Sequence, residues 1–218
     1  MDRMKKVMSW SNRPPELVSV LPPYCNMILT NVEEIRPRIH DYRKQLDKST
    51  NLLLSSWGKF DSGNICTKCP LWCLIKTQEV LVSAQRKFLE GSVGQLIKSL
   101  KSWEEECSQL LKKKLDLQRA LMDMNKVRDK QRQGRDNESA KNLINFTECT
   151  YNSQREDLIK DLSHYVQSEM NYQAKIKNFL EEQVKLLDSC RAKTDNLLNT
   201  TCLTSSGCTN LAHFYRLT

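Results

Sequence analysis

Apolar residues recur at seven-residue intervals through most of the chain. Two such rows lie close together in the middle of the sequence: Val93, Leu100, Cys107 and Leu121, and Leu96, Trp103, Leu110, Leu117 and Met124. A third row contains Ile144, Tyr151, Leu158, Tyr165, Tyr172, Phe179 and Leu186, and Leu162, Ile176 and Leu187 lie at neighbouring helical spacings. Rows at this interval place apolar side chains along one side of an α-helix, as in coiled coils. The pattern predicts two long helices, over about 74–133 and 138–190.

A third, shorter helix is predicted over about 24–57, after Pro22 and Pro23. Its apolar residues recur at helical spacing: Met27, Ile28, Val32, Ile35, Ile39, Tyr42, Leu46, Leu53 and Leu54. Pro37 lies inside it and is expected to kink it or to remove one hydrogen bond. Turn residues at 58–63 and a short polar segment around Gly134 separate the three helices.

The predicted helices are too long for a compact domain. At about 1.5 Å per residue, 74–133 would extend about 90 Å and 138–190 about 80 Å. A compact chain of this size has a radius of gyration of about 17 Å. The long helices must therefore lie antiparallel, and beside a second copy, to cover their apolar rows. We predict an all-α fold: an elongated antiparallel three-helix coiled coil that dimerises.

This prediction divides the chain into three parts. Residues 1–15 form an N-terminal amphipathic or disordered segment, 16–190 form the helical domain, and 191–218 form a loosely ordered tail. In residues 1–13, Met1, Met4, Val7, Met8 and Trp10 could form the apolar face of a membrane-inserting helix, with positive charge from Arg3, Lys5, Lys6 and Arg13. A disordered N-terminus is the equally weighted alternative.

Composition narrows the class of protein. The chain has 218 residues, of which 28% are charged and 39% hydrophobic, with few Gly and Pro. No apolar run approaches the roughly 20 residues that span a bilayer, and the N-terminus lacks a secretory signal pattern. We therefore expect a cytoplasmic protein with free cysteines, in which the sequons at Asn137, Asn145 and Asn199 are not glycosylated.

No catalytic motif is found. The three His are scattered at His40, His164 and His213, and phosphate-binding loops, Walker strings and metalloprotease strings are absent. Cys66, Cys69 and Cys73 have a spacing with which a zinc site can begin, but no fourth Cys or His lies near them in sequence. We predict no enzyme activity, no cofactor and no metal, and interpret these cysteines as part of a Cys-rich connector.

The net charge of +8 indicates a polyanionic partner. The basic residues that we assign to membrane binding lie near the predicted turn between the two long helices: Lys112, Lys113, Lys114, Arg119, Lys126, Arg128, Lys130, Arg132 and Arg135. With Lys141 included, they exceed the acidic residues of this stretch by five. Each Lys or Arg near an anionic leaflet contributes about 1 kcal/mol to binding. The alternative is a solvated hairpin end whose charge serves solubility.

Five stretches of the two long predicted helices are informative together: 86–90 (RKFLE), 96–101 (LIKSLK), 111–119 (LKKKLDLQR), 126–130 (KVRDK) and 162–174 (LSHYVQSEMNYQA). On these stretches, residues 81–187, about half of the chain, resemble the second and third helices of BAR domains, closest to the endophilin–amphiphysin branch. The sequence departs from the family in its short, Pro-interrupted first helix and its Cys-rich connector over 58–73.

The resemblance implies a crescent-shaped homodimer that senses or imposes curvature on anionic membranes, with roles in endocytosis and membrane trafficking. Carried over by position, the arm-tip contacts would be Lys126, Arg128, Lys130, Arg132 and Arg135, and residues 1–13 would correspond to the inserting helix. The apolar core and dimer contacts would include Leu96, Leu100, Trp103, Leu110, Leu158, Tyr165, Tyr172 and Phe179.

Two other functions compete with a membrane module. A coiled-coil scaffold or tether could use the same long faces to bind proteins such as small GTPases or other coiled-coil proteins, without remodelling membranes. Nucleic-acid binding is disfavoured, because aromatic residues are not interleaved with the basic ones. We therefore predict a peripheral membrane protein of the cytoplasm.

Overall fold

The computed structural model of the chain describes residues 20–56, 70–132 and 138–199. Within them, every residue except Val20, Leu21 and Pro22 is helical, and there is no strand. The predicted all-α class is therefore confirmed. The N-terminal segment 1–15 and the end of the predicted tail, 200–218, lie outside the described residues.

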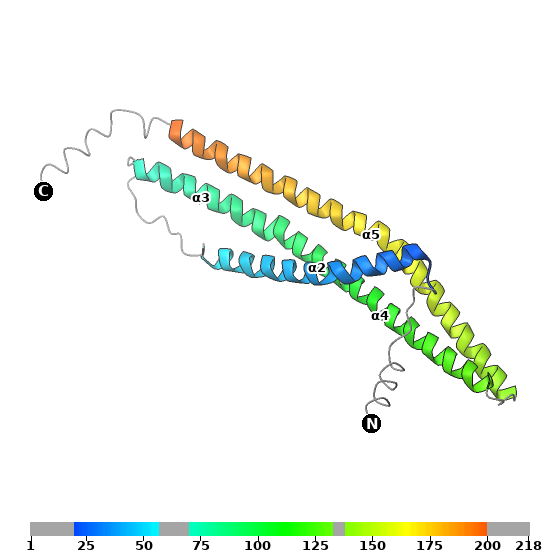
Figure 1. Cartoon of the computed structure of the whole chain (residues 1–218). Coiled ribbons are helices and arrows are strands. Elements are labelled where there is room, and N and C mark those ends of the chain that lie inside the picture. Colours follow the sequence, from blue (N-terminus) through cyan, green and yellow to red (C-terminus); the bar gives the residue numbers. More distant parts are fainter. Residues whose placement is uncertain (1–19, 57–69, 133–137, 200–218) are drawn as a thin grey trace, which may run out of the picture. The chain divides into compact units, whose positions relative to one another are not determined.

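The helices, in chain order, are α2 (Pro23–Ser56), α3 (Pro70–Phe88), the π-helical turn η3 (Leu89–Val93), α4 (Gly94–Arg132) and α5 (Glu138–Asn199) (Figure 1). Pro23 suits the first position of α2, where a missing N–H costs nothing. Pro37 lies inside α2 without ending it. The second predicted helix begins at Pro70 rather than near 74, and η3 separates it into α3 and α4.

The predicted end of the last helix at residue 190 was wrong, because α5 continues to Asn199. Over residues 191–199 the seven-residue apolar pattern is absent, and polar contacts along the helix are present instead. Arg191 Nε lies 3.8 Å from Asp195 Oδ2, one helical turn away, and Thr194 Oγ1 donates to the Cys190 carbonyl at 3.0 Å. Residues 191–199 are therefore helix, and not part of a loosely ordered tail.

The chain divides into two compact units. Unit 1 consists of Met1–Asp41 and Lys101–Tyr172, and unit 2 consists of Tyr42–Leu100 and Gln173–Thr218. In unit 1, α4 and α5 are antiparallel, since Lys113 pairs with Asp161 whereas Arg128 pairs with Glu148 (Figure 1). The α2 segment of unit 1 is also antiparallel to α4, as its ion pair between Glu33 and Lys114 and its contact between His40 and Glu104 show.

Unit 1 contains most of the buried apolar side chains among the described residues. Sixteen of the 20 lie there: Leu21, Cys25, Leu29, Val32, Ile39, Trp103, Cys107, Leu110, Leu117, Leu121, Met124, Ile144, Tyr151, Leu158, Leu162 and Tyr165. The other four, Val93, Leu96, Leu100 and Phe179, belong to unit 2. The seven-residue rows supply most of both sets, and of the eight residues assigned to the core only Tyr172 is half-buried.

An aromatic cluster joins α4 and α5 in unit 1. The Trp103 indole N–H donates to the Tyr165 hydroxyl at 3.0 Å, and the Cys107 sulfur lies 3.6 Å from the same oxygen. Trp103 also stacks on Tyr172, with ring centroids 5.2 Å apart. Burial raises the pKa of Tyr165, and raises that of Tyr172 to about 12 with help from Glu106. The cluster therefore holds its phenols protonated and its polar atoms paired.

Unit 2 has a thinner core, in which Phe88 stacks on Phe179 with centroids 5.5 Å apart. Three apolar residues on α5 remain exposed there: Leu180, Val184 and Leu187, with exposed fractions of 52%, 55% and 60%. Their spacing of four and three residues places them on one side of the helix. We call these three residues the α5 stripe. Leu187, predicted to lie at a core spacing, is instead one of its members.

Candidate functional site

The basic residues predicted to bind membranes lie on α4 in unit 1, except Arg135, which falls outside the described residues. Six of the eight form ion pairs. Lys113 pairs with Asp161, Lys114 with Glu33 at 2.5 Å, Arg119 with Asp116 at 3.1 Å, Lys126 with Asp123 at 3.2 Å, Arg128 with Glu148 at 2.7 Å, and Arg132 with Asp129 at 3.8 Å. Lys112 and Lys130 make no ion pair within the described part of the chain.

These pairs reduce the surplus positive charge that the sequence suggested at this end of α4. Three of the partner carboxylates come from α4 itself, and the others come from α2 and α5. Counted over the residues of unit 1, 19 Lys and Arg stand against 18 Asp and Glu. Unit 1 is therefore nearly neutral.

Unit 2 carries the net charge of the chain. Its residues include 15 Lys and Arg but only eight Asp and Glu, so seven of the eight net positive charges belong to it. Six of its cations make no hydrogen bond or ion pair with another described residue: Lys44, Lys48, Arg86, Lys87, Lys185 and Lys193. Uncompensated cations attract polyanions more strongly than paired ones do. The strongest candidate surface for an anionic partner is consequently on unit 2.

One groove of unit 2 lies between α3 and α5. It has a volume of about 330 Å³ and is lined by Glu79, Val80, Ser83, Ala84, Lys87 and Lys193. On α3, Glu79, Ser83 and Lys87 lie four apart, and Val80 and Ala84 are also four apart beside them, so that the five share one side of that helix. Lys193 is half-buried and reaches the groove from α5. We call this the α3–α5 groove.

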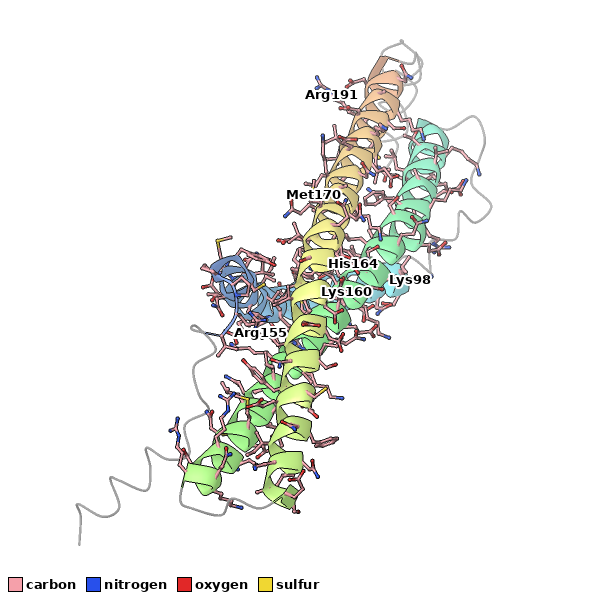
Figure 2. The ribbon with its side chains drawn as sticks, turned by 90° about the vertical axis from the view of Figure 1, so that its right-hand side faces the viewer. Lys98, Arg155, Lys160, His164, Met170 and Arg191 are labelled. Atoms are coloured by element: carbon pink, nitrogen blue, oxygen red, sulfur yellow. The ribbon has the colours of Figure 1, made fainter. Side chains whose placement is uncertain are left out.

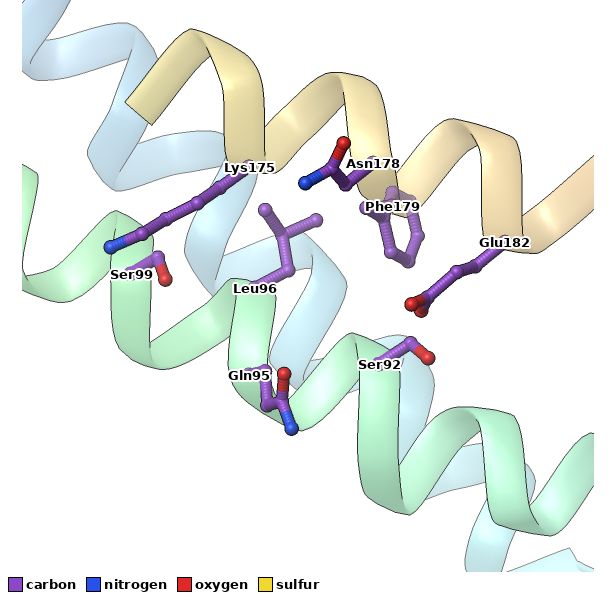
Figure 3. Close-up of a pocket in the computed structure, with 8 residues that line it drawn as sticks. All are labelled: Ser92, Gln95, Leu96, Ser99, Lys175, Asn178, Phe179 and Glu182. Carbon is purple, nitrogen blue, oxygen red and sulfur yellow. The ribbon is translucent and has the colours of Figure 1, made fainter. Parts of the chain in front are cut away.

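A second groove of unit 2 is smaller, about 200 Å³, and polar (Figure 3). Leu96 and Phe179 lie beneath it, and its other residues are Ser92, Gln95, Ser99, Lys175, Asn178 and Glu182. Figure 3 shows Lys175 reaching toward Ser99, and Glu182 toward Ser92. Its volume is below that of most small-molecule sites, about 300–1,000 Å³. Its cation and its anion leave no net charge to select an ionic ligand.

On α5, several polar side chains of unit 1 have defined positions. Figure 2 shows Arg155, Lys160, His164 and Met170 in order on this helix. Arg155 Nε donates a hydrogen bond to the Val20 carbonyl at 2.8 Å, and so holds the residues that precede α2 against α5 within unit 1. His164 is exposed and adjoins the buried Tyr165. It contacts a groove lined also by Glu106, Gln109, Leu110 and Asp161.

The described ranges contain neither a metal-binding cluster nor a membrane-spanning helix. No group of three or more His, Cys, Asp or Glu in the described ranges is arranged to hold a metal ion. Cys66 and Cys69, and the side chain of Cys73, lie outside the part of the chain that is described, as do Met1, Met4, Val7, Met8 and Trp10. No described helix combines the length and the apolar character required to cross a bilayer.

Comparisons of the chain with protein-family models, with curated proteins and with solved structures find no match.

Proposed function

We propose that this chain is a BAR-like helical module that binds anionic membranes as a homodimer and senses or imposes curvature. The observation that supports membrane binding is the charge imbalance of unit 2, 15 basic against eight acidic residues. The curvature and endocytic parts of the proposal come from the resemblance of residues 81–187 to BAR domains. The proposal moves the principal membrane contact from the basic residues of α4 to the cations of unit 2.

The magnitude of the electrostatic attraction is sufficient. Each Lys or Arg near an anionic leaflet contributes about 1 kcal/mol. The six cations of unit 2 that have no partner among the described residues would therefore provide several kcal/mol if they reached the surface together. This attraction fades over a Debye length, about 10 Å at 0.1 M salt. Binding of this kind is reversible and sensitive to salt.

The small number of buried apolar side chains in unit 2 supports the homodimer. Among the described residues, only four apolar side chains are buried there, against 16 in unit 1, while the α5 stripe stays exposed. A second copy offers the same stripe, and a two-fold arrangement would bring the two stripes together. Helical surfaces with apolar residues at these spacings are typical of coiled-coil association.

We expect the full chain to float with phosphatidylserine-rich vesicles at about 0.1 M salt and to leave them at about 0.5 M, where screening is stronger. Neutralising Lys44 and Lys48 in unit 2 (K44Q/K48Q) should weaken partitioning about 30-fold. Two lysines contribute about 2 kcal/mol, and 1.4 kcal/mol is a tenfold change.

The matched control is K112Q/K130Q, which removes two unpaired lysines from α4 in unit 1. It should weaken partitioning less than about threefold, since these residues belong to a nearly neutral unit. Equal losses in the two variants would show that unit 2 is not the principal contact. Equal partitioning to neutral phosphatidylcholine vesicles would refute anionic-membrane binding altogether.

A protein scaffold is the second candidate function, and the α5 stripe favours it. An exposed apolar row on a long helix can accept the apolar side of another protein's helix. In that case the chain would form stable complexes through α5 and would ignore vesicles of any composition. The flotation experiment therefore separates the two functions.

A further inference from the structure

We propose that the α3–α5 groove of unit 2 is a binding site for a phosphomonoester group. This inference deepens the proposed function, because a lipid headgroup is one source of such a group, although the site itself requires no membrane. Two lysines line the groove, its volume is about 330 Å³, and its walls are partly apolar.

The two lysines approach from different helices. Lys87 is on α3 and Lys193 on α5, and neither forms an ion pair or hydrogen bond with another described residue. Two ammonium groups in one groove repel each other unless an anion lies between them. A phosphomonoester carries a charge of about −1.5 to −2 at pH 7 and has three acceptor oxygens. It can accept charge-assisted hydrogen bonds from both lysines, and a further one from the Ser83 hydroxyl.

The acidic residue in the groove does not oppose this assignment. Glu79 accepts a hydrogen bond from Lys76 Nζ at 2.7 Å, so its negative charge is offset on its own helix. Lys76 does not line the groove. The charge available to a ligand is therefore that of Lys87 and Lys193.

The remaining lining residues suit an organic phosphate rather than a fully hydrated ion. Val80 is 48% exposed and Ala84 is half-buried, and both present apolar surface beside the lysines. The groove, at about 330 Å³, is large enough for a phosphate with a short glycerol-sized substituent. The chemistry fits the headgroup of phosphatidic acid and fits free glycerol 3-phosphate equally well.

The test compares vesicles that contain phosphatidic acid, a phosphomonoester, with vesicles that contain phosphatidylglycerol, a diester, at equal surface potential. The full chain should prefer phosphatidic acid about tenfold. The variant K87Q/K193Q should lose this preference. The control K48Q/K185Q removes the same charge from unit 2 outside the groove, and should keep the preference while binding both vesicles more weakly.

A second experiment, with a water-soluble phosphomonoester, distinguishes a lipid headgroup from a free phosphate as the ligand. Titration of the full chain with glycerol 3-phosphate should shift the NMR amide signals of Ser83, Ala84 and Lys87, and K87Q/K193Q should abolish these shifts. Shifts without a vesicle preference would support the site with a free phosphate as its ligand. The absence of both the preference and the shifts would overturn the site. If only the site is wrong, the chain would still bind anionic vesicles without preferring phosphatidic acid, and the proposed function would stand. If the chain binds no vesicles but glycerol 3-phosphate still shifts the amide signals, the site would stand and the proposed function would be refuted.

Discussion

Replacing Leu117 with alanine should lower the free energy of unfolding by about 2–5 kcal/mol. The Leu117 side chain is completely buried within unit 1, on the α4 side of its core. Its truncation removes apolar contacts and leaves a cavity that long packed helices close poorly. Because the whole unfolding free energy of a domain is about 5–15 kcal/mol, the loss would be a large part of it. Urea denaturation followed by circular dichroism measures the change.

The control is Leu115→Ala, two residues away on the same helix. Leu115 is 51% exposed, so the same truncation should cost less than about 1 kcal/mol. Similar losses for the two variants would mean that α4 does not present this face to the core. Both substitutions are favourable to helix propensity, so the difference between them reports on packing.

Tyr165→Phe is expected to cost about 1–3 kcal/mol of unfolding free energy, although it removes only one oxygen. That oxygen accepts the hydrogen bond from the Trp103 indole, and both side chains are buried. Without it, the indole N–H is left buried and unpaired. Tyr42→Phe, at a position that is 50% exposed, should change stability by less than about 0.5 kcal/mol. An equally small change for Tyr165→Phe would contradict the described hydrogen bond.

The same variant should alter the response to alkali. Burial raises the pKa of Tyr165 above its usual value of 10.0, so the unfolded chain loses this proton first as the pH rises. The stabilisation is thus fully present below about pH 10 and is lost as the pH rises above it. In Tyr165→Phe, the unfolding free energy should fall less steeply between pH 10 and 11 than in the original chain. Identical slopes would show that Tyr165 ionises freely in the folded state.

Much of the fold follows directly from the sequence. The seven-residue rows identify the buried positions from Val93 to Met124, and those from Ile144 to Phe179 with Tyr172 half-buried. Periodicity identifies these positions because one side of a helix must be apolar wherever it packs. The π turn at Leu89–Val93 has no comparable signal, although Gly91 and the adjoining Gly94 are residues that tolerate irregular helix.

The charge distribution could not be predicted in the same way. The basic residues of α4 exceed its acidic ones, and Glu33, Glu148 and Asp161, which offset part of this charge, are distant in sequence. The fold brings these carboxylates to Lys114, Arg128 and Lys113. In unit 2, by contrast, most of the surplus comes from Tyr42–Leu100, which has nine basic and four acidic residues spread along its length rather than gathered in one run. Ion pairing between helices decides which cations are free, and it depends on the register of those helices.

The proposed dimer has an electrostatic cost. Two copies of unit 2 would bring together seven net positive charges each. Like charges repel, and salt screens that repulsion over about 8–10 Å at physiological ionic strength. Self-association should therefore strengthen as salt is added, whereas membrane binding should weaken. An anionic membrane could also reduce the repulsion between the two copies, because its negative charge offsets their positive charge.

Self-association of the full chain is the claim on which the account most depends, and sedimentation equilibrium at about 0.15 M salt tests it most directly. One chain has a mass of 25.4 kDa. The account predicts a species of twice that mass, which shifts to the single-chain mass when Leu180, Val184 and Leu187 on α5 are replaced with glutamine. A single-chain mass for the original protein at every concentration would contradict it.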